Sequence, residues 1–172
     1  MLLSIKKYPN PILKIKADKV DRVDATIKEL IKQMKEIMKV SDGAGLAAPQ
    51  IGISKQIIII NTKNGAQAFI NPEIIEYGKK KKINQEGCLS FPGLWLKIVR
   101  PDEVKVKALD ENGKEIIIEA KSVMALVFQH EIDHINGIQF IERASLIEKI
   151  KAQKVLSQLR RDYGINRKVN RG

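Results

Sequence analysis

The strongest constraint on the fold is an eight-residue segment, residues 127–134, which reads VFQHEIDH. It contains both histidines of the 172-residue chain, His130 and His134, four positions apart. Side chains at positions i and i+4 lie above one another on a helix, so both imidazoles can face one point. Glu131 follows the first histidine, as in helices where two histidines bind a metal ion and a glutamate acts as general base. The segment predicts a helix that carries two metal ligands and needs a third.

Length and composition favour one soluble domain over residues 1–172. Apolar residues make up 44% of the chain and charged residues 30%, which is typical of globular proteins. The apolar run in residues 1–7 is too short for a signal peptide, and no stretch approaches the length of a bilayer span. Cys88 is the only cysteine, so no internal disulfide can form. We therefore expect a protein of the reducing cytoplasm that has no membrane partner.

The pattern of apolar residues predicts two flanking helices and several strands around the histidine helix. In chain order, we expect a helix over 24–40, strands over 56–60 and 68–77, a hairpin of strands 104–109 and 115–120, the histidine helix, and a last helix over 145–163. This order predicts an α+β fold in which mixed or antiparallel sheets surround a central metal-binding helix.

The histidine helix has recognisable ends. Ser122 is a candidate N-cap, and Asn136-Gly137 is a typical helix stop. The first half is apolar nearly all round, which predicts burial there. Two histidines at the end of a buried helix need polar partners, and a metal ion would be one.

Cys88 is the strongest candidate for the third ligand. A lone cysteine is usually a small core residue, but here it is the only other soft ligand in the chain. Cys88, His130 and His134 would leave a fourth position open, as in catalytic zinc sites. Glu142 or Glu148 remains an alternative, as in proteases that use two histidines and a carboxylate.

The net charge of +11 favours polyanionic neighbours, nucleic acid above all. Residues 143–172 contain nine basic and two acidic side chains, so this basic C-terminal helix and tail has a net charge of +7. A surface that faces a polyanion is the favoured interpretation, and a merely solvated helix is the alternative.

The small residues of 43–52 would let a ligand approach the backbone closely, although their spacing alone favours an ordinary loop.

Three segments together resemble the motifs of the peptide deformylases. They are residues 43–50 (GAGLAAPQ), residues 86–90 (EGCLS) and residues 129–134 (QHEIDH). Their order and spacing, the chain length, the YPNPIL opening at residues 8–13 and the basic terminal helix also fit this family. The resemblance covers essentially the whole chain.

The resemblance implies removal of the N-formyl group from the formyl-methionine of newly made polypeptides, with release of formate. A metal-bound water would attack the formyl carbon, with Glu131 as general acid and base. The metal is expected to be Fe²⁺, with Zn²⁺, Ni²⁺ or Co²⁺ able to occupy the site. The ligands would be Cys88, His130 and His134. Gln50 and the backbone N–H of Leu89 would be the oxyanion donors.

We expect a substrate pocket beside the metal, lined by Gly43, Ala44, Gly45, Leu46, Glu86, Val123, Leu126 and Val127. A tight wall of Gly45, Leu46 and Cys88 would exclude acyl groups larger than formyl. Asp133 and Arg100 are expected to support the ligands from behind, with Arg100 as a partner for Glu86. Ala44 and residues 91–96 depart from the usual family pattern, and this departure bears on the width of the pocket and on which side chains it accepts.

The resemblance also implies transient ribosome contact through the basic C-terminal helix, and we expect a monomer. Two other functions compete with the deformylase interpretation. A peptide-bond-cleaving metalloprotease would use the same helix with a carboxylate as third ligand. A basic RNA-binding module would use the metal only for structure.

Overall fold

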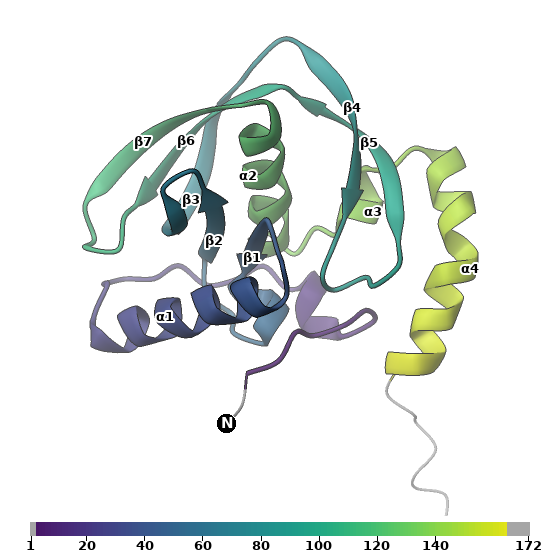
Figure 1. Ribbon diagram of the computed structural model, residues 1–172, viewed down its shortest axis with the longest axis horizontal. Coiled ribbons are helices and arrows are strands. Elements are labelled where there is room, and N and C mark those ends of the chain that lie inside the picture. The colour runs from purple at the N-terminus through teal and green to yellow at the C-terminus, as the bar shows by residue number, and fades with distance from the viewer. Residues whose placement is uncertain (1–2, 165–172) are drawn as a thin grey trace, which may run out of the picture.

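The computed structural model describes residues 3–164 and contains two antiparallel sheets (Figure 1). The larger sheet has the strand order β1-β2-β3-β6-β7, formed by Gly45–Ala47, Ile57–Thr62, Gly65–Tyr77, Glu103–Leu109 and Glu115–Lys121. The smaller sheet pairs β4 (Lys81–Gly87) with β5 (Trp95–Pro101). The helices are η1 (Pro11–Lys14), α1 (Ala25–Val40), η2 (Ala48–Ile51), α2 (Ser122–Ile135), α3 (Phe140–Arg143) and α4 (Leu146–Tyr163).

Helix α2, which carries both histidines, lies at the centre of the molecule between the two sheets (Figure 1). Helix α1 covers the opposite face of the larger sheet, and α4 stands against the smaller sheet. The predicted α+β fold with antiparallel sheets around a central helix is confirmed. The two flanking helices and the hairpin of β6 and β7 lie within one or two residues of their predicted bounds.

The four isoleucines of β2 explain how one sheet joins two cores. Ile58 and Ile60 pack with α2, whereas Ile57 and Ile59 pack with α1, because successive side chains of a strand point to opposite faces. All four are fully buried, which is why this strand is a continuous β-branched run. The sheet between α1 and α2 thus forms a rigid base for the histidine helix.

A third core fixes the smaller sheet to the C-terminal helix. Ala152, Leu156 and Leu159 of α4 are buried against apolar residues that include Leu96 and Ile98 of β5. Burying side chains of this size contributes about 1.5–3 kcal/mol for each large residue. Helix α4 is therefore part of the core and supports the segment that carries Cys88. The last part of the predicted basic tail, residues 165–172, lies outside the described residues.

One prediction about α2 is wrong and another is only partly right. Ser122 is the first helical residue rather than the N-cap; its φ is +52°, and the cap position is Lys121, whose side chain makes no capping bond. The apolar first half is buried only in part: Ala125 and Phe128 lie in the core, but Val123 is 72% exposed, while the polar second half is buried throughout. The apolar residues at the start of α2 instead border a cavity.

At α4, Ser145 caps the helix by accepting a hydrogen bond from the Glu148 N–H. The Glu148 carboxylate does not accept a hydrogen bond from the Ser145 N–H, since it accepts one from the Lys97 N–H on β5 at 2.8 Å. The spacing of Ser145 and Glu148 would allow a reciprocal capping box, but only the bond to Ser145 forms. Within residues 3–164, no helix combines the length and the apolar character needed to cross a bilayer.

Candidate metal centre

Cys88, His130 and His134 converge in space. Cys88 lies in the turn after β4, and both histidines lie on the buried half of α2. Their ligand atoms all lie within 4.8 Å of one another, and the Cys88 Sγ is 3.2 Å from the His134 Nε2. The pairing of β4 with β5, which brings the end of β4 over α2, was not predicted from the sequence.

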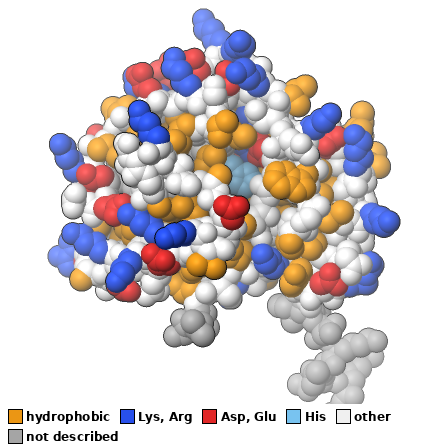
Figure 2. Space-filling view, in the orientation of Figure 1, with side chains coloured by type: hydrophobic (Ala, Val, Ile, Leu, Met, Phe, Trp, Pro, Cys, Tyr) orange, Lys and Arg blue, Asp and Glu red, His pale blue; other side chains and the backbone are white. Residues whose placement is uncertain are grey.

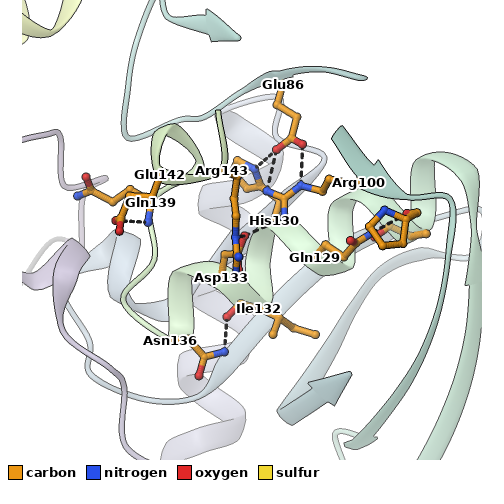
Figure 3. A network of polar contacts seen from close by, with 12 residues as sticks. Glu86, Arg100, Gln129, His130, Ile132, Asp133, Asn136, Gln139, Glu142 and Arg143 are labelled. Carbon is orange, nitrogen blue, oxygen red and sulfur yellow. Dashed lines mark hydrogen bonds and ion pairs between the residues drawn. The ribbon is translucent and has the colours of Figure 1, made fainter. Parts of the chain in front are cut away.

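Buried charges fix the far side of the His130 ring (Figure 3). The His130 Nδ1 lies 3.0 Å from the Glu86 Oε2, and Arg100 donates two hydrogen bonds to Glu86, at 2.7 and 3.0 Å. Arg100 also donates to Asp133 at 2.8 Å. At the surface, Arg143 completes the chain of contacts by donating to both oxygens of Asp133, at 2.6 and 3.1 Å. A carboxylate on the second ring nitrogen fixes ring orientation, as is common for metal-binding histidines.

The electrostatics of the three ligands suit a divalent cation. Burial alone raises the pKa of the Cys88 thiol, but the His134 and His130 rings beside it lower this pKa well below its ordinary value. Burial acts to lower the pKa of His130, yet its contacts with Cys88 and Glu86 leave the pKa well above the usual value. Both shifts therefore favour a Cys88 thiolate balanced by positive charge beside it, a place that a divalent cation would take. One thiolate and two imidazoles are a donor set that iron and zinc both accept.

Glu131 lies beside the ligands and borders the cavity, with 4% of its surface exposed. Burial raises the pKa of its carboxyl above the usual value, while the neighbouring imidazoles act in the opposite direction. Its Oε2 has no hydrogen-bond partner among the described residues. A buried carboxylate oxygen without a partner is costly, so the geometry leaves this oxygen available for a ligand in the cavity.

Gly45 provides the space that Glu131 occupies. A Cβ at position 45 would lie 2.5 Å from the Glu131 Oε1 and 2.8 Å from its Cγ and Cδ. We expect Gly45→Ala to displace the carboxylate and to lower kcat by about 10²-fold, the cost of a small misplacement at a reacting centre. Metal content should change little, because the ligands are untouched, whereas crowding of the buried Glu131 side chain should lower stability by about 1–3 kcal/mol. Steady-state turnover and metal analysis would check this, and an unchanged kcat would contradict it.

Gln50 points its amide towards the same centre from η2. Its Oε1 accepts a hydrogen bond from the Ala47 N–H at 2.8 Å, which fixes the orientation of the amide group. The Nε2 then lies 3.5 Å from the Cys88 Sγ and 3.4 Å from the Ser90 Oγ. The N–H of Leu89 has no acceptor among residues 3–164. The Gln50 amide therefore donates at the ligand Cys88, and the N–H of Leu89, the next residue in the chain, is left without an intramolecular acceptor among the described residues.

A cavity of about 480 Å³ opens beside Cys88 and His130, and Figure 2 shows a histidine at its floor between apolar side chains. Seven of the eight predicted pocket residues line it: Gly43, Ala44, Gly45, Glu86, Val123, Leu126 and Val127. Leu46 does not. It is fully buried in the core beneath α1, since β1 alternates its side chains and turns residue 46 away from the cavity.

Several residues of the cavity wall were not predicted. They include Lys7, Asp42 and Gln85. Residues 91–95, which the family pattern had already connected with the width of the pocket, also line the cavity, and Trp95 among them is 63% exposed. The alternative third ligands lie elsewhere: Glu142 accepts from the Gln139 N–H, and Glu148 is bound to β5. Among residues 3–164, the only group of converging ligands that contains both histidines is completed by Cys88.

The model of the polypeptide deformylase family matches residues 2–150 of the chain. A peptide deformylase of Dictyoglomus turgidum is 45% identical over 144 residues, which cover 84% of this chain and 94% of that protein. The solved structure of a peptide deformylase from Plasmodium falciparum is 39% identical, with a TM-score of 0.91 over 95% of this chain and 99% of the other. That of Thermotoga maritima is 40% identical, with a TM-score of 0.81 over 84% of this chain and 99% of the other.

These matches include the segments that carry the site and nearly the full length of the relatives. They agree with the three sequence motifs and with the geometry that brings these motifs together. The chain belongs to the polypeptide deformylase family.

Proposed function

We propose that the protein hydrolyses the N-formyl group of formyl-methionyl polypeptides and releases formate. The observation that carries this proposal is the convergence of the Cys88, His130 and His134 ligand atoms at the edge of a cavity that Cys88, His130 and Glu131 line, where one oxygen of Glu131 has no partner among the described residues. Three ligands with an open side are typical of catalytic metal sites, whereas structural sites are closed by four. Names of relatives from bacteria and plants support the same activity.

A bound divalent cation would lower the pKa of a water molecule towards neutrality and polarise the formyl oxygen. Glu131 would take the proton of that water and deliver it to the departing amine. Its buried position and raised pKa suit a group that must both accept and release a proton. The Gln50 Nε2 and the Leu89 N–H would stabilise the negative charge that develops on the formyl oxygen. Such a donor contributes about 3–4 kcal/mol in comparable sites.

The apolar start of α2 would receive the methionine side chain. Val123, Leu126 and Val127 border the cavity on the side of His130. On the other side, Gly45 and Cys88 would leave little room at the acyl group, so formyl would be accepted and larger groups excluded. We propose Fe²⁺ as the native metal, with Zn²⁺, Ni²⁺ or Co²⁺ able to replace it, because one thiolate and two imidazoles suit all of them.

The test is formate release from a formyl-methionyl dipeptide. The protein would be purified without oxygen, its metal content measured, and the acetyl-methionyl dipeptide used as the matched control substrate. We expect rapid formate release and little hydrolysis of the acetyl peptide. A metal-loaded sample that released no formate would overturn the proposal.

The metalloprotease alternative lacks its third ligand, because Glu142 and Glu148 are both held by backbone N–H groups away from the histidines. The alternative of an RNA-binding module with a structural metal gives no reason for an open cavity or for the unpartnered Glu131 oxygen. Both alternatives are therefore weaker than the hydrolase.

We further propose that the substrates are nascent polypeptides met at the ribosome. One catalytic domain over residues 1–172, working as a monomer in the cytoplasm, would make transient contact through the basic C-terminal helix and tail. Lys154 and Arg161 of α4 are exposed, while the opposite side of the helix is buried in the core. A truncation before α4 would therefore damage the core and could not isolate the effect of charge.

Reversing charge on the exposed face of α4 should weaken ribosome binding. We expect Lys154→Glu with Arg161→Glu to lower affinity several-fold and to reduce its dependence on salt, because fewer counterions are released from RNA. The matched control is Lys28→Glu with Lys32→Glu, the same change of charge on exposed positions of α1. Co-sedimentation with ribosomes at two salt concentrations would measure both. An equal loss of ribosome affinity in the α4 and α1 double variants would show that net charge, and not the face of α4, determines binding.

A further inference from the structure

Three consecutive residues near the N-terminus bridge the two segments that carry the proposed oxyanion donors. The Lys6 N–H donates to the Gln50 carbonyl at 2.7 Å, and the Tyr8 N–H donates to the Ser90 carbonyl at 2.9 Å. Between them, the Lys7 Nζ donates to the Leu89 carbonyl at 2.6 Å. Gln50 and Leu89 belong to separate elements, so this bridge sets their relative position.

The bridge is itself anchored from behind. Tyr8 is buried, and its ring stacks on Phe91 with 5.0 Å between ring centroids. The Tyr8 hydroxyl accepts a hydrogen bond from the Arg160 Nε of α4 at 2.8 Å. The segment of Lys6, Lys7 and Tyr8 is thus held between α4 and the turn that follows Cys88. A donor on an anchored segment fixes its acceptor better than one on a free chain end.

Successive carbonyls of the turn after β4 are all engaged. The Cys88 carbonyl accepts from the Phe91 N–H at 2.9 Å, and the Ser90 carbonyl accepts from Tyr8. The Leu89 carbonyl between them is held by Lys7, and this is the one bond of the three that a side chain makes. The N–H and the C=O of one residue are separated only by φ and ψ, so fixing the carbonyl restricts where the N–H can point.

We propose that Lys7 is a positioning residue, which holds the Leu89 carbonyl so that the Leu89 N–H faces the centre formed by Cys88, His130 and His134. Lys7 borders the cavity, and its charged donor makes a stronger hydrogen bond than a neutral one. It acts through Leu89 and needs no contact with the reacting atoms. This inference rests on the proposed function, because it concerns the donor that stabilises the reacting formyl oxygen.

The test compares Lys7→Met, which removes the donor and keeps the length, with Lys7→Arg, which keeps a charged donor. For Lys7→Met we expect kcat to fall by at least ~10-fold with KM nearly unchanged, since a misdirected oxyanion donor acts on the transition state. Lys7→Arg should recover most of that loss. Lys14→Met, which removes an exposed positive charge from the same region, is the matched control and should keep the wild-type kcat.

A second readout does not depend on turnover. Amide hydrogen exchange of ¹⁵N-leucine-labelled protein should show faster exchange and a shifted resonance for the Leu89 N–H in Lys7→Met, and neither change in Lys14→Met. Metal content and melting temperature, measured on the same samples, should match those of the wild type.

Three kinetic results would each overturn the inference: a Lys7→Met kcat within twofold of the wild type, a loss confined to KM, or no recovery in Lys7→Arg. An unchanged Leu89 resonance would overturn it as well. If the wild type itself released no formate, the proposed function would fail instead, and the exchange data would still report whether Lys7 orders Leu89.

Discussion

Replacing Glu131 by Gln should nearly abolish formate release and leave the metal in place. Glutamine has almost the same shape, so it fits the space beside Gly45 where an added Cβ would lie 2.5 Å from the Glu131 Oε1. It cannot accept a proton from water or return one to the amine. General acid–base catalysis contributes about 10²–10⁴ in rate, and we expect kcat to fall by at least that factor.

The metal should remain because Cys88, His130 and His134 keep their positions. Removing a buried carboxylate that has an unpartnered oxygen should also leave stability unchanged or raise it, since that oxygen contributes a desolvation cost. Metal analysis, melting temperature and single-turnover formate release would be measured together. The matched control is Glu36→Gln, the same substitution at an exposed position on α1. A variant that kept metal and wild-type turnover would remove Glu131 from the proposed mechanism.

The central helix and its neighbours could be predicted because their signals are local. Two histidines four residues apart need no tertiary information to face one point, and the β-branched run around Ile58 indicates a buried strand by itself. Cys88 followed from chemistry, because it is the only remaining soft ligand in the chain. Where the structure describes these residues, it brings Cys88 and the two histidines together.

The small sheet could not be predicted because its signal depends on partners that are distant in sequence. Strand β4 reads KKINQEG, which has few apolar residues. In β5, Leu96, Ile98 and Arg100 all point inwards, and the arginine interrupts an otherwise regular apolar alternation. Arg100 is stable there only because Glu86 and Asp133 neutralise it. A buried charge of this kind requires the tertiary fold to be known first.

Leu46 shows how a missed strand gives a wrong side-chain assignment. Residues 43–52 have the composition of a loop, so Leu46 was expected beside Gly45 in the pocket wall. In the structure, residues 45–47 form an edge strand of the larger sheet, paired with β2. Neighbouring side chains of a strand face opposite sides, so Gly45 lies against Glu131 while Leu46 enters the core under α1. Composition could not reveal this alternation, because glycine and alanine give no pattern.

Replacing Cys88 by Ser should remove both metal and activity. The Cys88 Sγ lies 3.2 Å from the His134 Nε2, and the two imidazoles lower the pKa of the thiol, so the sulfur is held as a thiolate ready to bind a cation. A serine hydroxyl stays protonated at neutral pH and is a poor ligand for iron or zinc. Loss of an outer partner already lowers metal affinity by about 10–100-fold, and loss of a ligand should exceed this.

The same substitution separates the hydrolase from a protease-like centre. If Glu142 or Glu148 were the third ligand, Cys88→Ser would keep its metal, and Glu142→Gln or Glu148→Gln would lose it. We expect the reverse, because both carboxylates are bound to backbone N–H groups away from the histidines. Metal titration of the four proteins under anaerobic conditions, with Glu131→Gln as the variant that binds metal without turnover, would measure this difference. If Cys88 is the third ligand, Cys88→Ser loses its metal, while Glu142→Gln, Glu148→Gln and Glu131→Gln all keep theirs. A centre with a carboxylate as third ligand would give a different pattern, because Cys88→Ser would then keep its metal.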